Sequence, residues 1–330
     1  MRCVSFDGVG DNGVVSIQTR ADPVPGRFEV LIATEYAAVN PADVLQREGM
    51  HPPPPGSPPD IPGLEVAGTV IACGDSVTCF EVSDRVFGLV GGGGLADRVV
   101  AHERELARIP DALDDEAAAS VPEAFITAFD ALSQAGLGAG DTLLVNGANG
   151  GVGTAAVQLG VALGARVVAS VRAAGRREAI AALGATALPA PEAFERVRSL
   201  GGAQAILELV GGVHMTENLG SLASTGTLVV VAAKPGDEVT LPLRELMGRR
   251  ARIVGTTLRR RPPEQKALLV QRFARRVVPL LAERRVAPIV DRVFDLSQAT
   301  SAFDHVRAPG KLGKVLLRTT TEGTLPDPGA

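Results

Sequence analysis

The chain has 330 residues, of which 45% are hydrophobic and 21% are charged, and its formal net charge is −4. This balance is typical of a folded protein with room for two domains, and it excludes a disordered chain. A small negative charge gives no general attraction to nucleic acid or to anionic membrane surfaces. The apolar runs are too short to span a bilayer, and residues 1–7 lack a signal-peptide core. We therefore expect a cytoplasmic protein with no nucleic-acid or membrane partner.

Up to about residue 120 the sequence predicts short β-strands separated by turns, with examples at 30–33, 66–71 and 85–90. A proline-dense stretch from His51 to Pro62 cannot join a sheet interior, so we expect a stiff surface loop. The run Gly91 to Gly94 is interpreted as a flexible connection.

From Glu116 onward, helical and apolar strand patterns alternate, which is typical of βαβ units with a parallel sheet. The expected strands are 142–146, 166–171, 205–210, 227–232 and 252–256, and the expected helices are 152–163, 176–183 and 192–200. A long helix over 264–284 follows, then a strand at 292–296, a helix at 298–305, a strand at 314–317 and a loose polar tail from 319 to 330. The fold class is therefore α/β, with a doubly wound parallel sheet and a β-rich part.

The strongest local motif is a glycine-rich segment placed between an expected strand and an expected helix. Its fingerprint residues are Ala148, Gly150 and Gly153, and Asn149, Gly151 and Val152 complete the loop. Small residues permit a tight turn, let the backbone approach a pyrophosphate and let the helix pack close to the strand. The free N–H groups at the helix N-terminus attract phosphates. The motif predicts a dinucleotide site.

The end of the next strand indicates which dinucleotide binds. NAD sites usually place an acid there to bond the ribose hydroxyls. Here the strand ends Ala169-Ser170-Val171-Arg172 with no acid, and Arg176 and Arg177 follow at the start of the next expected helix. Because arginines pair with a 2′-phosphate, we predict NADPH as the cofactor. The alternative is that these arginines form a solvated helix end.

Several stretches, spread over nearly the whole chain in the expected order, resemble the zinc-free quinone oxidoreductases of the medium-chain dehydrogenase/reductase superfamily. They include residues 39–43, 61–65, 121–129, 146–153, 255–259 and 313–316. The resemblance implies a GroES-like catalytic domain formed by residues 1–122 and 264–330, and a Rossmann NADPH-binding domain formed by residues 123–263. It also implies cofactor contacts at Thr127 and Leu258 and a homodimer, although Thr127 could instead serve helix packing.

Zinc is not expected, because the positions of the zinc ligands in related enzymes hold other residues. Asn40 stands in place of a cysteine and Leu64 in place of a histidine, and leucine cannot bind a metal. Without a metal, hydride transfer from NADPH to a quinone or to a conjugated C=C bond remains feasible, because such an acceptor is already electrophilic.

The resemblance points to three candidate catalytic residues. Asn40 could donate a hydrogen bond to the developing oxygen anion, or it could be a turn residue before Pro41. Asp43 is interpreted more as a structural partner than as a base. His51 stands where relatives often carry tyrosine, so it could move a proton or be an exposed loop histidine.

Three functions follow from these observations. The first is metal-free reduction of a quinone-type acceptor by NADPH, and the second is reduction of an enone or enoyl substrate. The third, from a different class, is a non-catalytic NADPH-binding protein. The short basic patch Arg259–Arg261 gives little support for nucleic-acid binding and could face NADPH instead.

Overall fold

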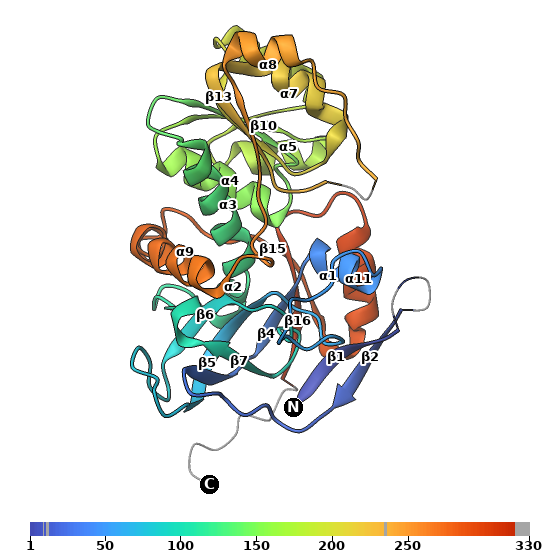
Figure 1. Cartoon of the computed structure of the whole chain (residues 1–330), viewed down its shortest axis with the longest axis vertical. Coiled ribbons are helices and arrows are strands. Elements are labelled where there is room, and N and C mark those ends of the chain that lie inside the picture. The colour runs from blue at the N-terminus through green and yellow to red at the C-terminus, as the bar shows by residue number, and fades with distance from the viewer. Residues whose placement is uncertain (9, 11–12, 234–235, 321–330) are drawn as a thin grey trace. The chain divides into compact units, whose positions relative to one another are not determined.

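The computed structural model describes residues 1–8, 10, 13–233 and 236–320 (Figure 1). These residues form two compact units. The first unit comprises Met1–Glu123, Arg259–Arg284 and the described residues from Val290 on, and the second comprises Ala124–Leu258 and Arg285–Ile289. The units thus divide one residue after the expected boundary at 122 and five residues before the one at 263. Residues 321–330, most of the tail that we expected to be loose, lie outside the described part.

The first unit is built mainly from antiparallel strands. A five-stranded sheet has the order β7-β3-β5-β6-β8, a three-stranded sheet has the order β15-β16-β4, and β1 pairs with β2. The strand bounds are β1 Arg2–Asp7, β2 Val14–Thr19, β3 Glu29–Ala33, β4 Tyr36–Val39, β5 Glu65–Cys73, β6 Arg85–Leu89, β7 Arg98–His102, β8 Leu106–Arg108, β15 Val290–Asp295 and β16 Lys314–Arg318.

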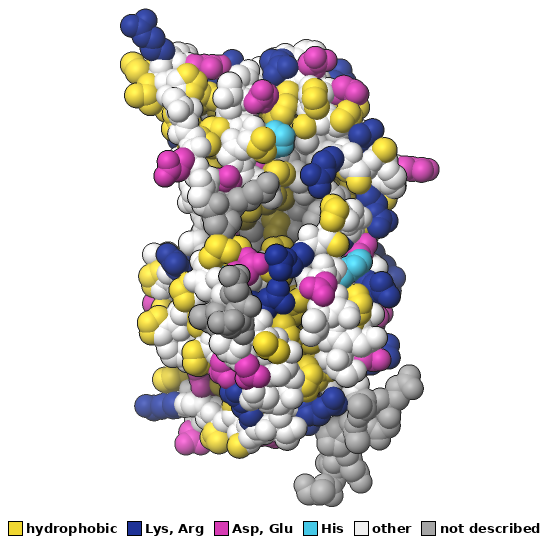
Figure 2. All heavy atoms as spheres, turned by 90° about the vertical axis from the view of Figure 1, so that its right-hand side faces the viewer, with side chains coloured by type: hydrophobic (Ala, Val, Ile, Leu, Met, Phe, Trp, Pro, Cys, Tyr) yellow, Lys and Arg dark blue, Asp and Glu magenta, His cyan; other side chains and the backbone are white. Residues whose placement is uncertain are grey.

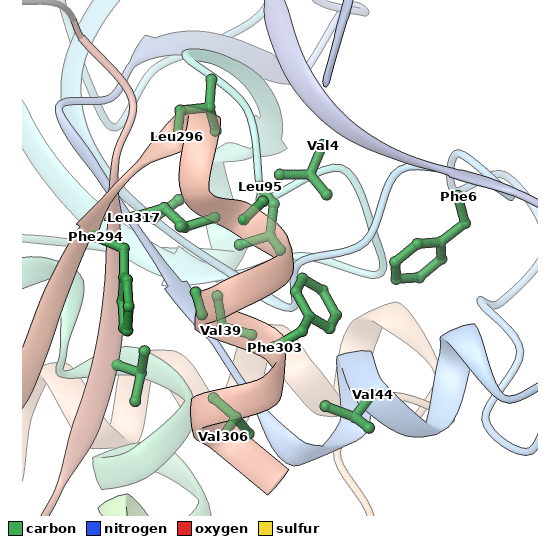
Figure 3. Packing of buried hydrophobic residues seen from close by; sticks show 14 residues of the cluster. Val4, Phe6, Val39, Val44, Leu95, Phe294, Leu296, Phe303, Val306 and Leu317 are labelled. Carbon is green, nitrogen blue, oxygen red and sulfur yellow. The ribbon is translucent and has the colours of Figure 1, made fainter. Parts of the chain in front are cut away.

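The helices of the first unit are joined to its sheets by apolar packing. Their bounds are α1 Pro41–Arg47, α2 Asp115–Ala119, α9 Pro263–Arg276, α10 Val278–Ala282 and α11 Ala299–Arg307. Figure 3 shows one core cluster of this unit, in which Phe303 of α11 lies among side chains from β1, β4, β16 and α1. Phe6 and Phe303 meet edge to face, with ring centroids 5.6 Å apart. This core fixes α1, which carries the candidate residue Asp43, and β16.

The second unit is a six-stranded parallel sheet in the order β11-β10-β9-β12-β13-β14. This is the 3-2-1-4-5-6 order of a dinucleotide-binding fold, so the predicted fold class is confirmed. The strands are β9 Thr142–Asn146, β10 Arg166–Ser170, β11 Thr186–Leu188, β12 Ala203–Glu208, β13 Leu222–Val230 and β14 Arg252–Gly255. The helices are α3 Pro122–Ala135, which begins in the first unit, α4 Gly151–Ala162, α5 Ala174–Ala181, α6 Ala190–Ser199, α7 Met215–Ser221 and α8 Leu243–Arg249.

Burial explains the apolar strands of this sheet. Every residue of β9 is buried, as expected for a central strand covered by helices on both faces. Leu144 of β9 and Ile206 of β12 belong to one core cluster with Phe194 of α6 and Leu219 of α7.

Two expectations about the fold were wrong in detail. The helix expected over 264–284 is two helices, α9 and α10, with Val277 between them. Pro279 explains the break, because proline is tolerated in the first turn of a helix and not in its interior. The second expectation was a flexible connection from Gly91 to Gly94, but Gly91 and Gly94 are closely packed against other segments. A Cβ on Gly91 would lie 2.2 Å from Ser57 Oγ, and one on Gly94 would lie 2.4 Å from the Glu65 carbonyl oxygen.

No helix among the described residues is long and apolar enough to cross a membrane. Basic and acidic side chains are interspersed over the face seen in Figure 2.

Candidate active site and cofactor site

The glycine-rich loop of the second unit has the geometry of a phosphate cradle. Gly147 follows β9 with a φ of +78°, a conformation that favours glycine. Helix α4 begins at Gly151, and Gly150 is its extended N-cap. A Cβ on Gly153 would lie 2.5 Å from the Gly147 carbonyl oxygen, so only glycine lets the helix approach the loop this closely. The first-turn N–H groups of α4 have no partners within the helix and can bind an anion.

The structure brings the predicted loop residues together. Ala148 is buried and its N–H donates to the Ser170 carbonyl oxygen at 3.3 Å, which joins the loop to the end of β10. Asn149, Gly150, Gly151 and Val152 are partly exposed, and Gly153 is buried.

The residues after β10 are basic. Ser170 ends the strand and is buried, Arg172 is exposed and Arg176 is partly exposed on α5. Arg177 is used differently, because its Nε donates to the Val171 carbonyl oxygen at 3.1 Å and holds the strand end. This arrangement leaves Arg172 as the exposed cation at the strand end.

Sequence reasoning missed a buried polar network at the carboxyl ends of β9 and β12. Glu208 Oε2 accepts hydrogen bonds from Asn146 and Asn218 at 2.9 and 2.8 Å. Its Oε1 accepts from the N–H groups of Val210 and Gly211 at 2.6 and 3.1 Å. The available signal was an acid at the end of an otherwise apolar strand, because a buried carboxylate needs several donors. The network fixes the loops that follow the two strands.

Three buried side-chain oxygen atoms of the second unit lack partners among the described residues, namely Thr127 Oγ1 on α3, Thr142 Oγ1 at the start of β9 and Asn146 Oδ1 at the end of β9. The glycine loop follows Asn146, whereas Thr142 lies at the other end of the strand. An unmade hydrogen bond at a buried hydroxyl is costly, so such atoms fit a site that a bound group completes. Together with the glycine cradle, Thr127 and Asn146 fit a dinucleotide. Leu258 is buried and contributes an apolar side chain.

In the first unit, Asn40 belongs to a buried network with Glu65 and Lys314. Lys314 Nζ donates to Asn40 Oδ1 and to Glu65 Oε1, the latter at 2.7 Å. Asn40 Nδ2 donates to Glu65 Oε1 at 2.7 Å and to the Ala38 carbonyl oxygen at 3.4 Å. Both the oxygen and the nitrogen of the Asn40 amide group therefore have hydrogen-bond partners. Direct contact between Asn40 and the substrate that accepts the hydride stays a prediction. Lys314 was not among the predicted site residues, since a lysine near the chain end gives no local signal.

Asp43 lies in the first turn of α1 and is fully buried. Its Oδ2 accepts from the Asn40 N–H at 2.8 Å and its Oδ1 from the Gly63 N–H at 2.7 Å. Burial raises the pKa of Asp43 to about 6, although these two bonds and the nearby Arg259 and Lys314 oppose the rise. The carboxylate holds the strand end and the loop before β5 together, which fits the structural role that we favoured.

Arg259 is buried and binds the start of the proline-dense loop through hydrogen bonds. Its guanidinium group donates to the carbonyl oxygens of His51 and Gly91 at 2.7 and 3.0 Å, and to Gln46 Oε1 at 2.6 Å. These bonds all lie within the first unit. Because burial and the cationic Arg259 and Arg260 lower the pKa of His51, its imidazole is mostly neutral near pH 7.

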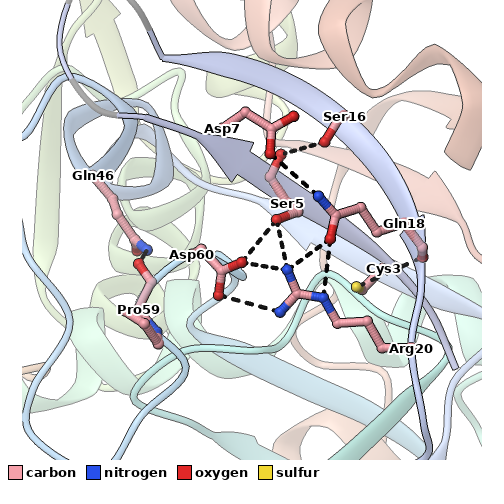
Figure 4. Close-up of polar contacts among 9 residues, drawn as sticks. All are labelled: Cys3, Ser5, Asp7, Ser16, Gln18, Arg20, Gln46, Pro59 and Asp60. Carbon is pink, nitrogen blue, oxygen red and sulfur yellow. Dashed lines mark hydrogen bonds and ion pairs between the residues drawn. The ribbon is translucent and has the colours of Figure 1, made fainter.

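The far end of the same loop is fixed by a second arginine (Figure 4). Arg20 pairs with the Asp60 carboxylate and also donates to Ser5 Oγ at 3.1 Å. The Phe6 N–H donates to the Asp60 carbonyl oxygen at 2.8 Å. The proline-dense loop is therefore held at both ends.

Glu123 is a further acid beside the Asn40 network that sequence reasoning did not single out. Its backbone N–H donates to Glu65 Oε2 at 2.8 Å, and its side chain is partly exposed. Burial is the largest cause that raises the pKa of Glu123 to about 8, and the negative charges of Glu65 and Asp43 add to it.

The described residues contain no group of three or more His, Cys, Asp or Glu side chains that could hold a metal ion. Cys3 is buried, Cys73 partly exposed and Cys79 exposed, and all three are free thiols. The donor set that zinc requires is therefore not assembled in the described part of the chain.

Comparison with known proteins shows the family to which this fold belongs. The alcohol dehydrogenase GroES-like domain family matches residues 26–111, and the zinc-binding dehydrogenase family matches residues 151–275. A quinone oxidoreductase of Lama guanicoe is 29% identical over 96% of this chain and 97% of its own length. The quinone oxidoreductase of Thermus thermophilus, whose structure is also known in complex with NADPH, is 33% identical, with a TM-score of 0.83 over 96% of this chain and all of that one. An NAD-dependent alcohol dehydrogenase is 27% identical, with a TM-score of 0.84 over 96% of this chain and 99% of that one.

A GroES-like unit together with a parallel dinucleotide-binding sheet defines an oxidoreductase that uses a nicotinamide cofactor. More narrowly, the chain belongs to the quinone oxidoreductase family of the medium-chain dehydrogenase/reductase superfamily.

Proposed function

We propose that the protein reduces a quinone-type acceptor with NADPH and without a metal ion. The observation that carries the proposal is a complete glycine cradle next to β10, a strand that ends at Ser170 and is followed by Arg172, with no acid for a ribose hydroxyl. NADPH supplies the hydride when bound. The residues of the second unit bind and orient its phosphates, and Thr127 and Asn146 offer oxygen atoms that lack partners among the described residues. The first unit supplies a buried polar network around Asn40 and no assembled zinc ligands among the described residues.

The choice of NADPH over NADH rests on Arg172 and Arg176. We expect Arg172→Gln with Arg176→Gln to raise the KM for NADPH by roughly tenfold or more, because each charge-assisted bond to the 2′-phosphate contributes about 1.5–3 kcal/mol. The KM for NADH should change little. Arg166→Gln, on an exposed arginine at the start of β10, is the matched control. Equal loss with both cofactors would contradict the assignment.

The acceptor is tested by following NADPH oxidation at 340 nm with 1,4-benzoquinone, 9,10-phenanthrenequinone and 2-cyclohexen-1-one. The chelator-treated protein should reduce a quinone at an unchanged rate. Selective reduction of the enone would favour the alternative of an enone or enoyl reductase. Tight NADPH binding without turnover of any acceptor would favour a non-catalytic NADPH-binding protein.

We propose further that the protein is a homodimer formed through the β14 edge of the parallel sheet. β14 is the last strand of that sheet, so its outer edge has unpaired backbone groups. Two exposed apolar side chains lie on α8, namely Leu243 at 63% and Met247 at 73% exposure. A two-fold contact would cover them.

Leu243→Glu with Met247→Glu should give a monomer in light scattering, whereas Leu268→Glu on the exposed face of α9 should leave the dimer intact. A wild-type monomer at micromolar concentration would contradict the proposal.

A further inference from the structure

The first unit holds a cluster of ionisable side chains with one acid more than it has bases. The acids are Asp43, Glu65 and Glu123, and the bases are Arg259 and Lys314. The charges of both bases and of the other two acids affect the pKa of Glu123. They come from α1, β5, α3, the segment after β14, and β16, so the cluster joins elements that are distant in the sequence. If all three acids were ionised, one negative charge would remain uncompensated in a poorly solvated place.

The hydrogen bonds identify which acid is left over. Both oxygens of Glu65 are bonded, Oε1 to Lys314 and Asn40, and Oε2 to the Glu123 N–H. Both oxygens of Asp43 accept backbone N–H groups. Each of these bonds favours the ionised form. By contrast, no residue in the described part of the chain hydrogen-bonds or ion-pairs with the Glu123 carboxyl group, which is also partly exposed.

We propose that Glu123 is the proton donor of the reduction. This inference rests on the proposed function. Hydride transfer adds two electrons and one hydrogen to the acceptor, which becomes a hydroquinone anion or an enolate. The Glu123 O–H bond then breaks, its proton joins the acceptor oxygen or the carbon next to the carbonyl, and Glu123 is left as a carboxylate. A proton from water restores the acid.

Two properties of Glu123 suit it to this role. With a pKa of about 8 it is protonated near neutral pH, whereas an ordinary glutamic acid is ionised there. An acid with a pKa near the working pH is an efficient general acid. Its carboxyl group makes no hydrogen bond with the described residues, so its proton is not engaged by another group of the first unit.

His51, the other candidate donor in the first unit, is less suitable. Burial lowers its pKa, and Arg259 and Arg260 repel a positive charge on the ring. The cationic form, which would donate the proton, is therefore scarce near pH 7.

The test compares Glu123→Gln, which has no acidic proton, with Glu123→Asp, which keeps a carboxylic acid. Glu192→Gln is the matched control, because Glu192 is an exposed acid in the first turn of another helix, α6. For each protein, kcat is measured from pH 6 to pH 10 with NADPH and whichever of 1,4-benzoquinone and 2-cyclohexen-1-one the wild type reduces. The Kd for NADPH and the thermal midpoint of unfolding are measured in parallel.

We expect the wild-type kcat to fall above about pH 8 as Glu123 ionises. Glu123→Gln should lower kcat by about 100-fold or more, a change on the scale of general acid catalysis. It should also abolish the fall of kcat at high pH. Glu123→Asp should keep part of the rate and the fall, and Glu192→Gln should match the wild type. An unchanged Kd for NADPH would separate the result from unfolding.

Two results would overturn the inference, and they are distinguishable. If the wild type turns over and Glu123→Gln keeps its rate within twofold and its high-pH fall, Glu123 is not the donor although the proposed function stands. If the wild type binds NADPH and reduces neither acceptor, the proposed function fails and the role of Glu123 falls with it.

Discussion

Lys314 carries its charge into the interior of the first unit, where its ammonium group joins Asn40 to Glu65. Its side chain is 6% exposed, and its ion pair with Glu65 measures 2.7 Å. The sequence placed Asn40 at a site but could not place Lys314, which is 274 residues further along the chain. Only the pairing of β16 with β4 brings the two together. The same holds for Glu123, whose position beside Glu65 depends on the fold and not on a local pattern.

Replacing Lys314 should be strongly destabilising. Lys314→Met would leave Glu65 buried without its counter-charge, and the loss of one partner of a buried ion pair typically costs about 3–5 kcal/mol. Urea denaturation followed by circular dichroism measures the change. Arg104→Gln removes the exposed Arg104–Glu264 pair and should hardly move the midpoint. Equal effects of the two variants would contradict the importance of the buried network.

The raised pKa values of Asp43 and Glu123 also predict how stability depends on pH. A raised pKa means that the folded protein keeps a proton that the unfolded chain releases, so the free energy of unfolding falls as pH rises. For Glu123 the fall runs from its ordinary pKa of 4.5 to about 8, and for Asp43 from 3.8 to about 6. The slope contributed by one group is at most about 1.4 kcal/mol per pH unit. Urea midpoints at pH 6 and 8.5 should therefore differ, and by less in Glu123→Gln; identical slopes would contradict the pKa assignment.

At the scale of elements, the glycine loop is the part that the sequence predicted best. The motif lies between β9 and α4, and all of its determinants are local: the small residues, the strand before and the helix after. The break at Val277 depended on a visible proline and could have been anticipated. The close packing of Gly91 and Gly94 could not, because it depends on Ser57 and Glu65, which belong to other segments.

Gly153 should tolerate no side chain. Gly153→Ala would place a Cβ 2.5 Å from the Gly147 carbonyl oxygen, so the backbone must shift. We expect the free energy of unfolding to fall by about 1–3 kcal/mol, as in other overpacked sites, and NADPH to bind more weakly. Gly220→Ala on α7 is the control, because its Cβ would lie 3.7 Å from Glu245 Oε1, an ordinary contact, and alanine favours helices. Calorimetry of unfolding and fluorescence titration of NADPH measure both effects.

At the scale of the whole molecule, the order of secondary-structure patterns along the chain was enough to predict an α/β fold with a parallel sheet. The return of the chain to the first unit was expected at residue 264, and only through the family resemblance; in the structure it begins at Arg259, and Arg285–Ile289 belongs to the second unit. No local pattern states that β16 pairs with β4 or that Arg259 lies inside the first unit, because both depend on contacts between distant segments. The candidate sites differ in the same way. The glycine loop is formed by consecutive residues and could be predicted, whereas the buried acid–base cluster is formed by residues that are distant in the sequence and could not.

The proposed reaction passes hydride from NADPH to a conjugated acceptor without a metal ion. A single-turnover experiment with chelator-treated protein tests it, by comparing NADPH with NADPH deuterated at the transferred C4 position. We expect 1,4-benzoquinone to oxidise both cofactors, the deuterated one more slowly, and added zinc to change neither rate. Oxidation that appears only when zinc is added would contradict the proposal.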